Sequence, residues 1–160
     1  MPNLVKGGNC YVSLEEATAY FENRLDVAAW EEAGADNQQK ALITATGVLD
    51  QLAWEGYISD VTQVLAFPRV VSYFDPRLGR RVCSNGLTIP DKLLIATYEL
   101  AYHFLNNDGI LDSTGSVTDL QLGNITLKEV SNPALIPATV RRIIRPLLIN
   151  QGSLPVWRAW

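Results

Sequence analysis

Apolar positions recur at helical spacing in four stretches of the chain. The first stretch begins where Ser13 and Glu16 form the sequence pattern of a capping box, and it continues to about Arg24. After a short helical turn around 27–33, further helices are expected at about 36–52, 88–107 and 137–148. In the last of these, apolar residues at i, i+3, i+4, i+7 and i+8 lie opposite three arginines, which predicts one buried face and one exposed face.

Two other stretches have the alternation that is typical of strands. Residues 117–130 alternate on both sides of a Gly123-Asn124 pair, which predicts a hairpin with a two-residue turn. Between the second and third helices, the β-prone pieces 70–74 and 81–83 flank turn residues and predict a projecting loop or a second hairpin. The expected fold class is therefore mainly α: a four-helix domain with one or two β-hairpins and extended N- and C-terminal arms.

The two ends of the chain are expected to be arms around a domain that covers 13–150. Residues 1–12 contain Gly7-Gly8 and predict a flexible N-terminal arm. Residues 151–160 contain two helix breakers and yet are rich in Trp, whose exposure to water is unfavourable. This C-terminal arm either folds back onto its own domain or inserts into a partner. The candidate docking residues are Leu154, Pro155, Val156, Trp157, Arg158 and Trp160.

Composition and charge narrow the class of protein. A chain of 160 residues fits one globular domain, and no apolar run has the length of a membrane span, so we expect an intracellular protein with no membrane partner. The formal net charge is −4, which argues against a protein that coats nucleic acid with a uniformly basic surface. A local basic patch stays compatible with this charge.

The sequence offers no recognised constellation for catalysis. Phosphate-binding loops, dinucleotide-binding loops and nucleophile elbows are absent. Cys10, Cys83 and His103 are far apart in sequence and could supply at most part of a metal site. We therefore expect no enzyme activity, no catalytic residue, no metal and no cofactor.

The basic residues are the more informative candidates. Arg69 and three further arginines lie within 69–81, and a second group of three lies in the last predicted helix. Arginine forms bidentate bonds with carboxylates and with phosphates. These side chains could pair with acidic groups of the same or a neighbouring subunit, contact DNA phosphates, or remain solvated. The candidates are Arg77, Arg80, Arg81, Arg141, Arg142 and Arg145.

The order of elements from Tyr11 to Arg69, which closes with L-A-F-P-R, resembles that of small neck proteins of tailed bacteriophages, a family labelled DnaT-like or head–tail adaptor. The similarity is weaker at 89–101 and returns in I-I-R-P-L-L at 143–148. It implies a non-enzymatic head–tail connector of the virion, made in the bacterial cytoplasm. Its expected partners are the portal protein, a downstream neck or tail protein, and copies of itself in a ring, usually of twelve, with double-stranded DNA passing through the lumen.

The label DnaT-like also implies an alternative function, the binding of single-stranded DNA. Such a protein needs a basic groove with aromatic side chains on which bases stack. Tyr73 and Phe74, near the arginines of 69–81, could supply a small one. The negative net charge and the lack of a longer basic track in the sequence favour the connector hypothesis.

Overall fold

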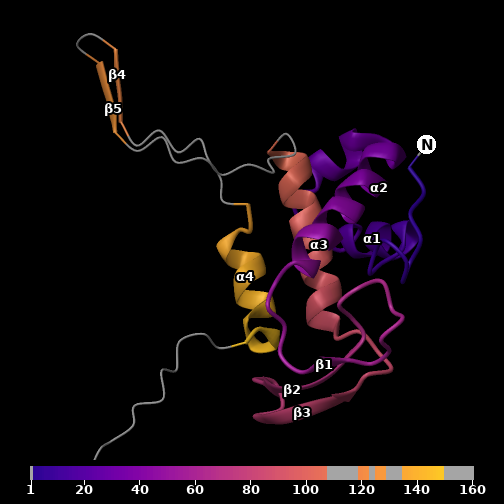
Figure 1. Ribbon diagram of the computed structural model, residues 1–160. Coiled ribbons are helices and arrows are strands. Elements are labelled where there is room, and N and C mark those ends of the chain that lie inside the picture. Colours follow the sequence, from indigo (N-terminus) through magenta and orange to yellow (C-terminus); the bar gives the residue numbers. More distant parts are fainter. Residues whose placement is uncertain (1, 108–118, 123–124, 129–134, 150–160) are drawn as a thin grey trace, which may run out of the picture.

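The computed structural model describes residues 2–107, 119–122, 125–128 and 135–149 (Figure 1). The arm at 151–160, with its candidate docking residues, lies outside the described residues. The elements in chain order are α1 (Leu14–Phe21), α2 (Ala28–Asp50), β1 (Tyr57–Ile58), β2 (Arg69–Asp75), β3 (Arg80–Asn85), α3 (Asp91–Asn106), β4 (Asp119–Leu122), β5 (Ile125–Lys128), α4 (Ala138–Ile144) and the 3₁₀ turn η1 (Arg145–Leu147).

The prediction of a mainly α fold is wrong. Strands β1, β2 and β3 form an antiparallel sheet in that order beside the helices, so the fold is mixed α and β. The predicted second hairpin is present as β2 and β3, but both strands are longer than the β-prone pieces in the sequence. The third strand, β1, has only two residues, Tyr57 and Ile58, and so short a strand has no alternation from which it could be predicted.

Several local predictions are confirmed. The capping box of α1 is formed, since Ser13 Oγ accepts a hydrogen bond from the Glu16 backbone N–H at 3.3 Å and Glu16 Oε2 accepts one from the Ser13 N–H at 2.9 Å. Helix α2 is interrupted at Gly34, where φ is 70°, which separates the short helix from the longer one as expected. Strands β4 and β5 pair with Leu122 opposite Ile125, as a two-residue turn requires.

Helix α3 is the centre of the packing. It lies between α2 and α4, and eight of its sixteen residues are buried (Figure 1). The eight are Leu93, Ala96, Thr97, Tyr98, Leu100, Ala101, Tyr102 and Phe104. Because these residues cover most of the helix circumference, α3 can be packed on two sides at once.

The chain after α4 attaches this helix to the loop that precedes β1. Pro146 shortens the helix, which ends as the turn η1, and η1 packs against β2. The Glu55 N–H donates to the Leu147 carbonyl at 2.9 Å, and the Ile149 N–H donates to the Ala53 carbonyl at 3.0 Å. These bonds place α4 next to the three-stranded sheet.

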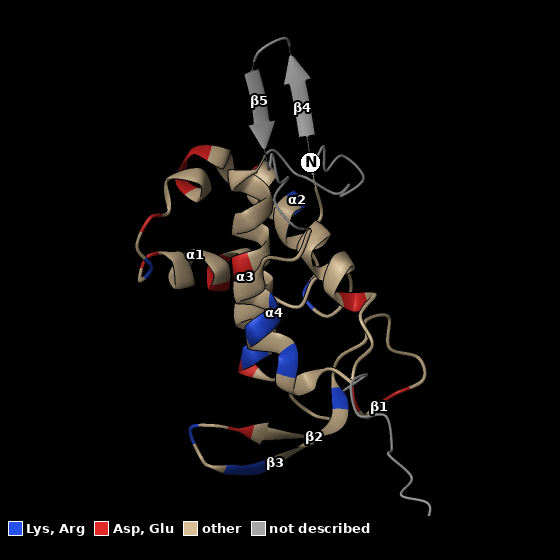
Figure 2. Ribbon diagram, turned by 90° about the vertical axis from the view of Figure 1, so that its left-hand side faces the viewer, with Lys and Arg blue, Asp and Glu red and all other residues tan. Residues whose placement is uncertain are grey.

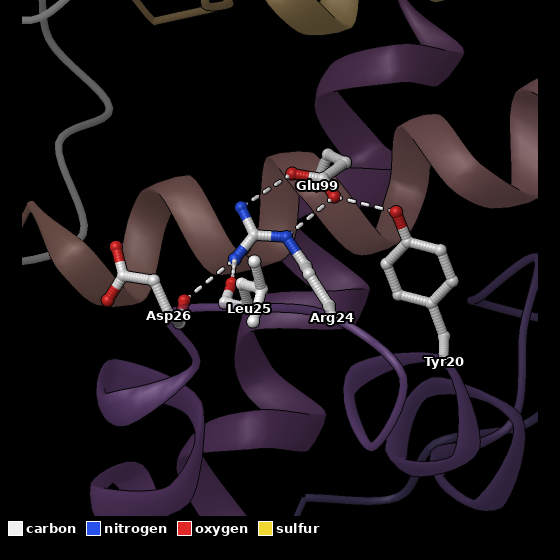
Figure 3. A network of polar contacts seen from close by, with 5 residues as sticks. All are labelled: Tyr20, Arg24, Leu25, Asp26 and Glu99. Atoms are coloured by element: carbon white, nitrogen blue, oxygen red, sulfur yellow. Dashed lines mark hydrogen bonds and ion pairs between the residues drawn. The ribbon is translucent and has the colours of Figure 1, made fainter.

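A polar network fastens the segment after α1 to α3 (Figure 3). The Arg24 guanidinium donates to both carboxylate oxygens of Glu99, at 2.9 and 3.0 Å, and Tyr20 Oη donates to the same carboxylate at 2.6 Å. Nη1 of Arg24 also donates to the carbonyls of Leu25 and Asp26. The network thereby holds the turn between α1 and α2 against the central helix.

We expect Glu99→Gln to lower the free energy of unfolding by about 2 kcal/mol, because the half-buried Arg24 loses its counter-charge while it stays desolvated. Urea unfolding measures this change. Glu32→Gln, at an exposed position of α2, is the matched control and should change stability by less than about 0.5 kcal/mol. Equal effects of the two substitutions would show that the network adds nothing beyond surface charge.

Candidate nucleic-acid interface

The three-stranded sheet has two different faces. Val71 and Asp75 of β2 are buried and point toward the body of the protein, with the half-buried Tyr73 between them. Because side chains alternate along a strand, Ser72 and Phe74 point the other way. Residues paired directly across antiparallel strands share a face, which adds the neighbours in the register to this side. We call this side the outer face; its residues are Tyr57, Val70, Ser72, Phe74, Arg81, Cys83 and Asn85.

The outer face exposes two aromatic rings. The exposed fraction is 49% for Phe74 and 66% for Tyr57. Arg81 lies opposite Phe74, and its guanidinium is held by Ser72, whose side-chain and backbone oxygens accept hydrogen bonds at 3.2 and 2.7 Å. A shallow hollow of about 250 Å³ covers part of this face, and it is lined by Glu55, Gly56, Tyr57, Val70, Val71, Ser72, Arg81, Cys83 and Ser84.

Arg69 has a structural role in this sheet. Its guanidinium donates to the backbone carbonyls of Gly56 (2.7 Å), Glu55 (3.2 Å), Trp54 (3.4 Å) and Ala66 (3.4 Å). These bonds hold the irregular segment between α2 and β2 on the end of β2. Because most of the guanidinium donors are used in this way, Arg69 is a poor candidate for a phosphate contact.

The candidate arginines of the hairpin differ in their partners. Arg77 pairs with Asp75, its Nη2 lying 3.3 Å from Oδ2, and this interaction lowers the pKa of the Asp75 carboxyl. Arg80 opposes Asp75 in the strand register and is exposed, and within the described residues it forms no ion pair. Arg81 is bonded to Ser72 and to no carboxylate of the described part of the chain.

Helix α4 and the turn η1 carry the second group of candidates. Arg141, Arg142 and Arg145 are exposed, while Val140 and Ile144 on the opposite side are buried against the core. The amphipathic pattern seen in the sequence is thus confirmed. Among the residues that the structure describes, none of the three arginines pairs with a carboxylate, so their positive charges face solvent.

Charge is segregated between the two ends of the protein. Residues 69–92 and 138–147 contain eight of the thirteen Lys and Arg residues and only two acidic residues, Asp75 and Asp91. Residues 13–36 contain seven acidic residues and one basic residue, Arg24. Glu55, by contrast, lies beside η1, since its N–H donates to the Leu147 carbonyl. Figure 2 shows the basic positions on α4 and on the β2–β3 hairpin below it, and acidic positions around α1. We call the first group, formed by β2, β3, the start of α3, α4 and η1, the basic end.

The sequence reasoning missed the basic end because its parts are distant in the chain. About sixty residues separate Arg81 from Arg141, and η1 meets β2 only in the folded protein. Lys92, which was not among the candidates, also belongs to it. A hollow of about 210 Å³ between the hairpin and α3 is lined by Tyr73, Asp75, Arg77, Asp91, Lys92 and Ile95. The sequence showed the two groups of arginines, but it held no signal that the two segments lie next to each other in the fold.

Other candidate chemistry is not brought together in the described part of the chain. Cys10 is buried and Cys83 is exposed, and both are free thiols. Burial raises the pKa of the Cys10 thiol, and its sulfur accepts a hydrogen bond from Thr46. The described residues include no group of three or more His, Cys, Asp or Glu side chains that could hold a metal ion. Nor does any helix among them combine the length and apolar character of a membrane span.

The comparison with protein families identifies the chain's relatives. Residues 2–159 match the model of a family described as "Putative DnaT-like ssDNA binding protein". The chain belongs to this family. No curated protein and no solved structure matched it.

Membership of the DnaT-like family overturns the head–tail connector hypothesis. The expected portal protein, the neck or tail partner, the ring of twelve subunits and the DNA-conducting lumen are withdrawn with it. The reason for the error lies in the residues that carried the resemblance. Tyr11, Trp54 and Phe67 are buried and pack on one another, with ring centroids 6.2 Å apart for Tyr11 and Phe67 and 5.1 Å apart for Trp54 and Phe67. Such residues determine how the core closes and carry no information about what the surface binds.

Gly56 lies close to β2 at the edge of the outer face. Substitutions of Gly56 and of Gly79 test this close contact. Gly56 has φ +77°, and an added Cβ would lie 2.1 Å from the Val70 carbonyl oxygen. Gly79 has φ +61° and open space around it. We expect Gly79→Ala to lower the free energy of unfolding by about 1 kcal/mol through backbone strain alone, and Gly56→Ala by roughly 2 kcal/mol more through the clash. Urea unfolding compares the two, and equal losses would contradict the tight contact between β1 and β2.

Proposed function

We propose that this protein binds single-stranded DNA through its basic end. The observation that carries the proposal is the segregation of charge, which gathers eight basic and two acidic residues in segments that fold next to each other. The description of the family names the same ligand. The proposal replaces the connector hypothesis with the alternative that the sequence left open.

The exposed arginines suit the phosphate backbone. A cation that neutralises a phosphate releases a condensed counterion, and this release is the main electrostatic gain in binding nucleic acid. Arg80, Arg141, Arg142 and Arg145 are exposed, and no carboxylate of the described residues competes for them. The fork of N–H donors in each guanidinium can bond two phosphate oxygens at once. The proposed role is therefore binding without a catalytic step.

The negative net charge of the chain supports a restricted contact. The seven acidic residues of 13–36 repel phosphates, which disfavours a bound strand at α1 and at the start of α2. A chain of net charge −4 can in this way hold a short piece of single-stranded DNA although it cannot coat a long one. The negative net charge argued against a uniformly basic surface. It does not argue against a surface on which the basic residues are gathered in one place.

A salt titration tests the proposal. A labelled oligothymidylate of about 20 nucleotides is titrated with the full chain at several NaCl concentrations, and fluorescence anisotropy gives Kd. We expect log K to fall linearly with log salt concentration. Replacing Arg141, Arg142 and Arg145 together by Gln should weaken binding and reduce the slope by up to about 2, at roughly 0.7 for each phosphate that is no longer neutralised.

Lys40→Gln is the control for this experiment, because Lys40 is an exposed cation on α2 among the acidic residues. It should leave both Kd and the slope nearly unchanged. Binding that is absent even at low salt would refute the proposed function. An equal loss in the control would show that binding responds to net charge and not to the basic end.

A further inference from the structure

Phe74 and Tyr57 are the two aromatic side chains that the outer face exposes, by 49% and 66%. Neither contributes to the hydrophobic core, which β2 reaches through Val71 on its other side. Both rings lie on a face that also presents a tethered arginine and a hollow. Exposed aromatic rings beside arginines are the elements from which base-stacking surfaces for single strands are built.

We infer that the outer face is a base-stacking subsite, on which Phe74 and Tyr57 each stack an unpaired nucleobase and Arg81 contacts the backbone between them. The inference rests on the proposed function and adds to it the residues that distinguish a single strand from a duplex. It assigns to Tyr57 and Arg81 roles that charge alone does not give.

The strand register sets the spacing of the two rings. Tyr57 pairs with Val70, and Phe74 is four residues farther along β2. At about 3.3 Å per residue, the two positions are roughly 13 Å apart along the strand. The rings therefore cannot stack on the same base, and they mark two points of a track that follows β2. The hollow lined by Ser72, Arg81 and Cys83 lies along this track.

Arg81 is held in place for a contact with the strand. Two of its five N–H donors are bonded to Ser72, which fixes the plane of the guanidinium and leaves the other donors available. Arg81 opposes Phe74 in the register and its guanidinium is bonded to Ser72, so its charge lies between the positions of the two rings along β2. A positioned arginine loses less side-chain freedom on binding than a free one.

The arginines and the aromatic rings give the surface two separate properties. Phosphates are present on single strands and duplexes alike, so the arginines of the basic end favour both. The faces of duplex bases are covered by their neighbours in the stack, so only an unpaired base can stack on Phe74 or Tyr57. Removal of a ring should thus weaken the binding of single strands without changing the number of phosphates that are neutralised.

The first test compares Phe74→Leu and Tyr57→Leu with Leu78→Ala. Leucine keeps apolar bulk and removes the ring, and Leu78 is a 53%-exposed apolar residue in the turn of the same hairpin. We expect each ring variant to bind the oligothymidylate about tenfold more weakly, with an unchanged salt slope. A duplex of equal length should bind more weakly than the single strand, and the ring variants should leave its affinity unchanged. Leu78→Ala should match the unchanged protein in all three measurements.

Several results would overturn the inference. Ring variants that bind single strands normally would exclude stacking at these positions. Equal losses for single strand and duplex, or a loss in Leu78→Ala as large as in the ring variants, would mean that the hairpin contributes only through its shape or as an apolar contact for another protein. Urea unfolding of each variant shows whether the sheet is intact.

The second test uses the unchanged protein and the exposed thiol of Cys83, which lines the hollow. Cys10 is fully buried and should not react with an aromatic disulfide reagent in the folded state. We expect saturating oligothymidylate to slow the reaction of Cys83 at least severalfold. If the oligonucleotide binds and Cys83 reacts at its original rate, the stacking subsite is wrong while the proposed function stands. If no oligonucleotide binds at low salt, both are wrong.

Discussion

Helix α3 is buried on two sides, and the positions of the other elements follow from this burial. Leu93, Leu100 and Phe104 are almost fully removed from water, so α2 and α4 must both remain in place for the helix to stay covered. Glu99 of the same helix holds Arg24 and with it the turn before α2. The sheet is attached to this helical body through Val71 and through the contact of β2 with η1. The amphipathic helix α4 thus has two roles. One of its faces covers α3, and the opposite face exposes its arginines.

The sequence predicted the features that are encoded locally. Four such features follow from residues within a few positions of one another: the capping box at Ser13, the apolar face of α3, the break near Gly34, and the register of β4 and β5. The features it could not predict join distant segments. Strand β1 pairs with β2, and the Gly56 carbonyl before it accepts a bond from Arg69, thirteen residues later in the chain. The basic end forms because η1 packs on β2, and no pattern in either segment predicts this contact.

The error about function has the same origin. The resemblance to phage connectors was carried by Tyr11, Trp54 and Phe67, which form one aromatic cluster in the core. A core can be shared by proteins with different surfaces, so a fit to its packing pattern is weak support for a partner. Net charge misled in a similar way, since a sum over 160 residues hides two segments of opposite sign. The distribution of charge over the folded surface was the more informative quantity.

Asp75 shows how an acidic residue can serve a basic surface. Asp75 is 3% exposed, and its carboxylate accepts hydrogen bonds from the backbone N–H and the side chain of Arg77, so it shapes the turn between β2 and β3. Its charge is balanced by Arg77, which leaves Arg69, Arg80 and Arg81 as the net charge of the hairpin. The hydrogen bond with Arg77 lowers the pKa of Asp75, so the stabilisation is complete above the unfolded value of about 3.9 and is lost only as the pH falls through the lower folded value. The shape of the turn is therefore independent of pH near neutrality. Over that range the arginines of the hairpin keep the same position toward a bound strand.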